Sequence, residues 1–311
     1  MQKSSFLVGL INSDKKNISE FLATWDDLNV FAKSIGKSFD FLSKLWKTNK
    51  EIEEENLNSF KEKVDDYLKK STVKTKAELF KRFQEIFEIK IEKISSQKQL
   101  DEIANEIESQ AVIFQKEFTK ADNKLKTFVG ASFVDLRKHF LETMINQFKE
   151  LNNEKQKKVL EEMVNKLNNL SAAELKEFKE KMKIEDISKE SIKKIILGGA
   201  AYSAVAGTVG LVGFPAYIFL TSFIGGLSSF IGITLPFGFY TGATSMMAFL
   251  SSWFLPIVLA GGWLFSRKYT KKLRKVFTVA SMVSISFQSY KDIDLNIMDE
   301  FIIEYNKQIN S

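Results

Sequence analysis

Apolar residues recur along the first half of the chain at alternating steps of four and three. This spacing gives an α-helix one apolar face. In the clearest run the steps form a heptad seam that continues for almost four repeats. Its members are Phe21, Trp25, Leu28, Ala32, Ile35, Phe39, Leu42 and Trp46. The pattern predicts one long amphipathic helix over this part of the chain.

The same spacing predicts further helices downstream. They are expected near residues 51–70, 76–95, 99–127, 131–152 and 154–169. Ser171 and Glu174 then match a capping box, in which each side chain satisfies a backbone donor of the other, so a helix over 172–183 should follow. No run of period two has any length. We interpret the Phe-rich stripes as packing faces between helices; the alternative is a docking face for a partner helix.

One segment departs from this pattern. Residues 195–266 form 72 consecutive positions without Asp, Glu, Lys, Arg or His, and they hold all three prolines and twelve of the fifteen glycines. About 20 apolar residues cross a bilayer, and a charge at its centre costs roughly 3 kcal/mol. The segment is therefore expected to enter a lipid membrane. Two alternatives stay open: a hairpin buried within a soluble bundle, or one buried in solution and inserted later.

Both flanks of the segment are positive, and cytoplasmic flanks of membrane helices carry excess Lys and Arg. The flanking cations are Lys193, Lys194, Arg267, Lys268, Lys271, Lys272, Arg274 and Lys275. Flanks of equal sign predict an even number of crossings, with both ends of a hairpin on the cytoplasmic side. We expect one arm near 195–222, a turn region near 225–238 and a return arm near 240–266.

Residues of three kinds stand out inside the hairpin. Prolines mark two kinks and the turn, small residues four apart allow close helix contact, and a tryptophan at its end suits the headgroup level. The positions singled out are Ile195, Gly199, Ser203, Gly207, Pro215, Pro236, Gly238, Gly242, Pro256 and Trp263. The spacing favours association between the arms or between copies of the chain.

The expected fold class is all-α, a long-helix bundle with an extended hydrophobic helical hairpin. Three regions are predicted: a charged amphipathic bundle over 1–190, the hairpin with its basic flanks over 191–270, and a helical tail over 271–311 that packs back on the bundle. The tail helix would bury Met298, Phe301, Ile302 and Tyr305.

Composition argues against several kinds of chemistry. The chain has no cysteine and one histidine, so we expect no catalytic thiolate, no metal site and no cofactor. His139 is expected to be a surface or boundary residue. The Gly36-Lys37-Ser38 sequence lacks the preceding glycine of a P-loop.

The net charge of +6 is too evenly spread for a nucleic-acid partner. Residues 6–11 are too short an apolar run for a cleaved signal, and a leaderless export route stays open. We expect no enzyme.

Two resemblances bear on function. The combination of a charged helical bundle with one apolar hairpin resembles the helical pore-forming toxins and the colicin channel domain. Residues 235–242 (LPFGFYTG), Gly261-Gly262-Trp263 and the run over 269–284 resemble the bacterial YaaW-like family across about residues 150–290. That family usually has a proline in the last run, whereas residues 275–278 have none, and it implies no established activity.

Two functions follow from these patterns. The first is a membrane-permeabilising or pore-forming effector, soluble before its hairpin inserts, whose copies associate through the Gly-rich faces. The alternative is a constitutive integral-membrane scaffold whose cytoplasmic bundle recruits a helical protein partner. In either case the lipid membrane is the expected partner and localisation.

Overall fold

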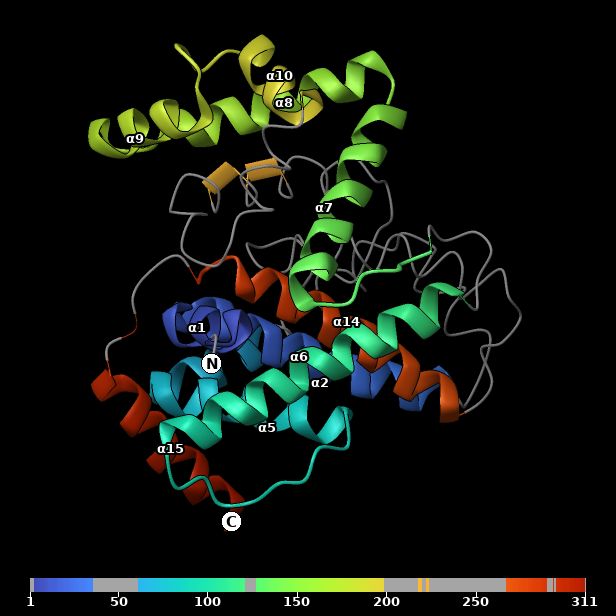
Figure 1. Cartoon of the computed structure of the whole chain (residues 1–311), viewed down its shortest axis with the longest axis vertical. Coiled ribbons are helices and arrows are strands. Elements are labelled where there is room, and N and C mark those ends of the chain that lie inside the picture. The colour runs from blue at the N-terminus through green and yellow to red at the C-terminus, as the bar shows by residue number, and fades with distance from the viewer. Residues whose placement is uncertain are drawn as a thin grey trace.

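The chain is all-helical wherever the computed structural model describes it (Figure 1). The described residues are 3–35, 61–120, 127–198, 218–219, 222–223, 267–289, 293 and 295–310. No strand occurs among them. The predicted all-α class is therefore confirmed for this part of the chain.

The helices form a lower and an upper group that are connected by α7 (Figure 1). The lower group comprises α1 (Ser5–Asn12), α2 (Lys15–Ile35), α5 (Thr72–Ile86), α6 (Gln97–Lys120), α14 (Arg267–Ser286) and α15 (Leu295–Ile309). The upper group comprises α8 (Asn153–Asn168), α9 (Ala172–Met182) and α10 (Lys189–Leu197), and α7 (Phe133–Glu150) rises between the two. A further helical stretch over 61–69 precedes α5.

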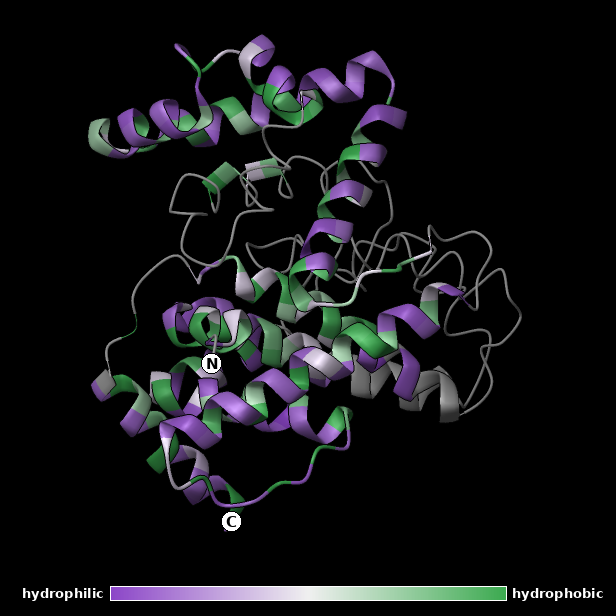
Figure 2. Ribbon diagram, viewed as in Figure 1, coloured by the Kyte–Doolittle hydropathy of each residue, from purple (hydrophilic) through white to green (hydrophobic). Residues whose placement is uncertain are grey.

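Aromatic side chains from distant parts of the sequence fill the core of the lower group. Phe6 of α1 stacks on Phe80 of α5, with ring centroids 6.1 Å apart. Phe301 and Tyr305 of α15 meet the same Phe80 edge-on, at 5.7 and 5.8 Å. Figure 2 shows apolar and hydrophilic residues sharing the same helices, as expected of amphipathic elements that bury one face. The core thus joins both ends of the chain to α5.

The two backbones of α1 and α14 approach each other closely at Gly9. A Cβ at this position would overlap with the carbonyl group of Ile285 and with Cα of Ser286. Glycine is therefore required for this contact. Residues 5–11 of α1 are all buried, and α1 begins at the N-cap Ser4, whose hydroxyl accepts a hydrogen bond from Leu7 N at 3.1 Å.

A polar network joins α2 to α5 at the edge of this core. Arg82 donates from Nη1 to Asp26 (2.8 Å) and from Nη2 to both Tyr67 Oη (2.7 Å) and Glu78 (2.8 Å). Tyr67 donates to the second oxygen of Asp26 at 2.6 Å, and Lys70 pairs with Glu78 at 2.8 Å. Because Arg82 donates to three side chains and Lys70 pairs with Glu78, the charges of this cluster stabilise the α2–α5 contact.

The predicted capping box at the start of α9 is confirmed. Glu174 accepts a hydrogen bond from Ser171 N at 2.9 Å, and Ser171 Oγ accepts one from Glu174 N at 3.3 Å. Helices α7, α8 and α15 also lie where the apolar spacing places them. The long heptad helix is helical as far as Ile35, and its remaining members, Phe39, Leu42 and Trp46, lie outside the described residues.

Two predicted helix ends are wrong. The helix expected over 76–95 ends at Ile86, because Glu88 adopts a left-handed backbone (φ 60°) and Ile94 then pairs with the side chain of Asn306 in α15, at 2.9 and 2.8 Å. The helix expected to reach 127 is described as far as Lys120, and residue 127 is not helical. Phe128 N donates instead to Thr119 Oγ1 of α6 at 2.9 Å.

Candidate functional site

The site singled out by the sequence is the uncharged segment with its two basic flanks. The structure describes both flanks, a few residues at the start of the segment and two short stretches inside it. Ile192, Ile195 and Ile196 are fully buried, and α10, which carries them, contacts α8. The helix ends at Leu197, where Gly198 N donates to Lys194 O at 2.7 Å. The segment therefore begins on the upper group.

Most of the residues singled out in the hairpin lie outside the described residues. They are Gly199, Ser203, Gly207, Pro215, Pro236, Gly238, Gly242, Pro256 and Trp263. Phe219 and Phe223, inside the segment, are described and are buried. Their rings stack at 6.1 Å, and Phe223 meets Phe148 of α7 edge-on at 5.8 Å. Part of the apolar segment is thus covered by the long connecting helix.

The first basic flank lies on α10. Lys194 is exposed and Lys193 is partly buried. Earlier in the same helix, Lys189 pairs with Glu161 of α8 at 2.5 Å. This ion pair and the buried isoleucines hold α10 against α8, so the flank belongs to the upper group.

The second basic flank forms the first turns of α14 and rests on the lower group. Lys271 pairs with Glu88, and the ammonium group of Lys272 lies 5.0 Å from the centre of the Phe118 ring. Lys275 lies 5.9 Å from the ring centres of both Phe87 and Phe114. Cations over aromatic faces are attracted by the ring quadrupole. We call this arrangement, Lys271, Lys272 and Lys275 on the aromatic side chains and Glu88, the docked flank.

The remaining cations of this flank differ in environment. Arg274 is partly buried, and desolvation lowers its pKa. Arg267 and Lys268 lie in the first turn of α14. The sequence predicted a basic patch here. The structure adds that its central lysines contact Glu88 and aromatic side chains of the lower group.

Glu88 holds an unusual backbone position for the residue that faces this flank. Its φ of 60° lies in the left-handed region, which disfavours residues with a Cβ. The carboxylate is exposed, and its hydrogen bond and charge attraction with Lys271 lower its pKa. The sequence gave no signal for this residue, because a glutamate after a helix is ordinarily a solvated charge.

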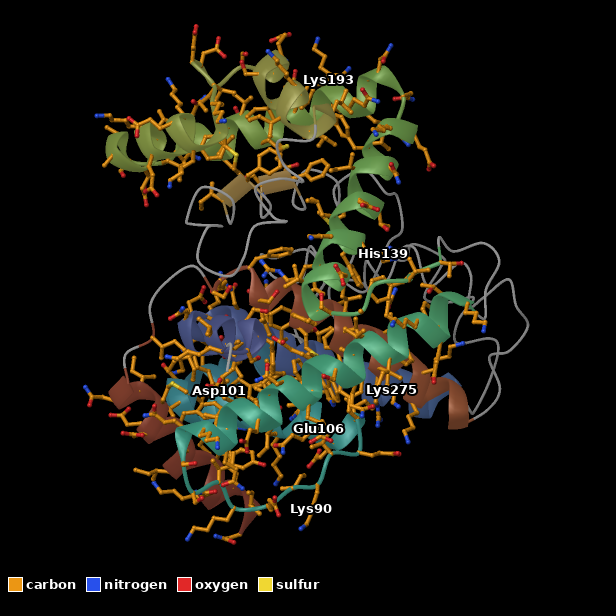
Figure 3. All side chains as sticks on the ribbon, in the orientation of Figure 1. Lys90, Asp101, Glu106, His139, Lys193 and Lys275 are labelled. Atoms are coloured by element: carbon orange, nitrogen blue, oxygen red, sulfur yellow. The ribbon has the colours of Figure 1, made fainter. Side chains whose placement is uncertain are left out.

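The two flanks lie in different groups of helices. Figure 3 shows Lys193 on the upper group and Lys275 on the lower group, with α7 between them. Ion pairs and buried apolar side chains fix each flank locally, as described above. In this arrangement the basic residues do not form one common surface.

The sequence also missed a pair of buried charged groups, one near the start of α7 and one on α6. Arg137 is only 1% exposed and is the largest of the side chains that the structure describes as fully buried. Glu108 of α6 accepts hydrogen bonds from Phe6 N (2.8 Å), Ser4 Oγ (2.9 Å) and Ser5 Oγ (3.1 Å), and so caps α1. Burial raises the pKa of Glu108 in spite of these bonds. Neither residue departs from the helical pattern, so the sequence does not reveal their burial.

Three further sequence features concern catalysis and metal binding: the single histidine, the Gly-Lys-Ser sequence and the acidic side chains. His139 is partly buried on α7, with its ring 5.2 Å from that of Phe128, in the boundary position expected for it. Gly36, Lys37 and Ser38 lie outside the described residues. Over the described ranges, no three His, Asp or Glu side chains come together as a metal site would require.

No family model, no curated protein and no solved structure matches the chain. The resemblance to the YaaW-like family therefore stays a prediction. Among the helices described, none is both long enough and apolar enough to cross a bilayer.

Proposed function

We propose that the chain is a membrane-inserting helical protein, and that it permeabilises membranes through its uncharged segment. One observation carries the proposal: 72 consecutive residues without a formal charge, bounded on both sides by lysine-rich helices. Each Leu, Ile, Phe or Val contributes about −0.5 kcal/mol to insertion, and no charge opposes it. The segment would form the extended hydrophobic hairpin of a long-helix bundle.

The environment of the described residues supports storage of this segment before insertion. Phe219 and Phe223 are buried, with Phe223 against Phe148, and Ile195 is buried where α10 meets α8. Apolar side chains that are covered by protein do not need lipid to leave water. This arrangement favours an effector that first folds and then rearranges, with residues 1–190 as the charged bundle and 271–311 as its returning tail.

Dye release from lipid vesicles tests the proposal directly. The full chain should release a trapped dye, and paired charges at the centres of the two arms, Val209→Asp with Phe254→Asp, should abolish release, because each costs roughly 3 kcal/mol in the bilayer. The matched variant, Val209→Thr with Phe254→Tyr, makes the same two positions polar without adding a charge and should retain release. Absence of leakage for the unmodified chain across neutral and anionic lipids would overturn the proposal.

A second function is a constitutive scaffold, favoured by the positive charge on both flanks. This distribution is typical of hairpins inserted during synthesis with both ends in the cytoplasm. The bundle would then recruit a helical protein partner or a second copy. Carbonate extraction discriminates the two functions. A protein that stays in the membrane pellet from synthesis onward is a scaffold, whereas one that purifies from the aqueous fraction without detergent is the stored effector.

A further inference from the structure

Arg137 is a buried charge without the partners that such a group normally has. Its side chain is 1% exposed, and within the described part of the chain none of its Nε, Nη1 and Nη2 atoms has a hydrogen-bond partner. Burial lowers its pKa to about 10, against the opposing effect of the Glu108 charge. A guanidinium taken from water without hydrogen bonds is strongly unfavourable. The group therefore weakens the packing in which it lies.

The neighbours of Arg137 compensate this cost only in part. Its guanidinium lies 4.9 Å from the centre of the Phe287 ring, which attracts a cation weakly. The charge of Glu108 attracts Arg137, but no ion pair within 4.0 Å joins these two described side chains, and the carboxylate instead holds the first residues of α1. Arg82 is different, because three side chains accept hydrogen bonds from its guanidinium group.

Arg137 lies where a loss of packing would affect the contact between the two groups of helices. It stands at the lower end of α7, where α7 contacts α6 and α14, and we call this contact the α7 joint. Farther along, the same helix covers Phe223 of the uncharged segment through Phe148. The helix also carries the upper group, and with it the first basic flank, away from the second (Figures 1 and 3). Movement at the α7 joint would therefore change both the Phe148–Phe223 contact and the distance between the two basic flanks.

We propose that Arg137 is a built-in destabilising charge that lets the α7 joint open, so that α7–α10 separates from the lower group and Phe148 moves away from Phe223 of the uncharged segment. The opening would allow both basic flanks to reach one membrane surface, where anionic headgroups attract lysine and arginine. The link to the membrane rests on the proposed function; the opening of the joint in solution does not.

Thermal denaturation of the full chain tests whether the charge destabilises. Replacement of a buried, unpaired charge by an apolar side chain of similar volume is often stabilising, so Arg137→Met should raise the Tm by roughly 2–8 °C. Arg137→Lys keeps a buried cation and should give no such rise. Arg82→Met, the matched control, removes a partnered arginine and should lower the Tm.

A second variant separates the charge of Arg137 from its effect on Glu108. Arg137→Met leaves the Glu108 carboxylate without the cation that opposes the effect of burial on its pKa, so Arg137→Met with Glu108→Gln removes both charges. The double variant should have a Tm at or above that of Arg137→Met. A Tm below that of the unmodified chain for both variants would show that the guanidinium stabilises the joint, and would overturn the inference.

Opening can be measured because the chain has no cysteine of its own. Lys90 and Lys176 are exposed residues below and above the joint, and both can be replaced by cysteine and spin-labelled. The distance distribution in solution should contain a second population that grows on vesicles of phosphatidylglycerol. In the Arg137→Met background that population should fall about tenfold.

The outcomes distinguish the two proposals. If the unmodified chain releases dye while the label distances stay fixed, the α7 joint does not open and this inference fails, whereas the proposed function stands. If no dye is released but the solution distribution still responds to Arg137→Met, the joint opens and the proposed function fails. Equal distributions for Arg137→Met and Arg137→Lys would show that charge is not the cause.

Discussion

Gly9 of α1 lies against the carbonyl oxygen of Ile285 in α14 so closely that a side chain cannot fit between the two helices. The contact joins residues from opposite ends of the sequence. It also shows that α14, whose first turns form the docked flank, is held at its far end by the buried N-terminal helix.

We expect Gly9→Ala to destabilise the fold by about 1–3 kcal/mol, the usual cost of overpacking a tight core. The change would increase helix propensity, so the loss reports the α1–α14 contact alone. Urea denaturation should show a lower midpoint. Lys16→Ala, at an exposed position in α2, is the control and should stay within about 0.5 kcal/mol of the unmodified chain. Equal midpoints for the two variants would contradict the contact.

The α2–α5 network should make stability sensitive to acid. Burial raises the pKa of Glu78, but its contacts with Lys70 and Arg82 outweigh burial and hold the pKa below the ordinary value of 4.5. The contribution of Glu78 is therefore present above pH 4.5 and is lost as the pH falls through its lowered value. Glu78→Gln should reduce stability at pH 7, and the difference from the unmodified chain should shrink at lower pH. A difference that is independent of pH would count against this network.

Lys76 should give a pH dependence of the same sign in a separate, alkaline range. It is 6% exposed and donates to Ile11 O, at the end of α1, at 2.5 Å. Burial lowers its pKa to about 8, so the unfolded chain binds more protons between pH 8 and 10.5, and stability should rise with pH over that range. Relative to Lys76→Met, which does not titrate, the gain should be about 3 kcal/mol. Chemical denaturation at pH 7, 8, 9 and 10 would measure it.

The docked flank predicts a charge-dependent response to lipid. Glu88→Lys replaces the partner of Lys271 with a like charge, and should release the flank and raise binding to phosphatidylglycerol vesicles about threefold to tenfold. Vesicle flotation measures this binding, and phosphatidylcholine vesicles should show no change. Glu88→Asp keeps the charge and is the matched control. An equal increase for both variants would indicate that the left-handed backbone, and not the ion pair, restrains the flank.

Local signals in the sequence predict much of this fold. The capping box of Ser171 and Glu174 is formed by neighbours, and the apolar faces of α7 and α8 follow from helical periodicity. The early end of α5 depends instead on the distant Asn306, which holds Ile94 in an extended connection. No local pattern contains that information.

The candidate site is predicted less completely. The basic residues were identified from charge alone, but their contacts with Phe87, Phe114 and Phe118 depend on how α14 packs on both α5 and α6. Arg137 lies between Lys138 and apolar neighbours in a sequence that reads as an ordinary helix boundary. Its burial arises only when α1, α6, α7 and α14 come together, so tertiary packing determines it.

The pairing of α1 with α14 also has a consequence for synthesis. Ribosomes add about 5–20 residues per second, so α1 waits roughly 10–60 s for the helix that buries it. The uncharged segment precedes α14 in the sequence, so it leaves the ribosome before α14 does, while the lower core is still incomplete. Chaperones and the membrane insertion machinery would therefore meet the segment before its own fold can cover it, and their relative speed would decide whether the newly made chain is stored or inserted.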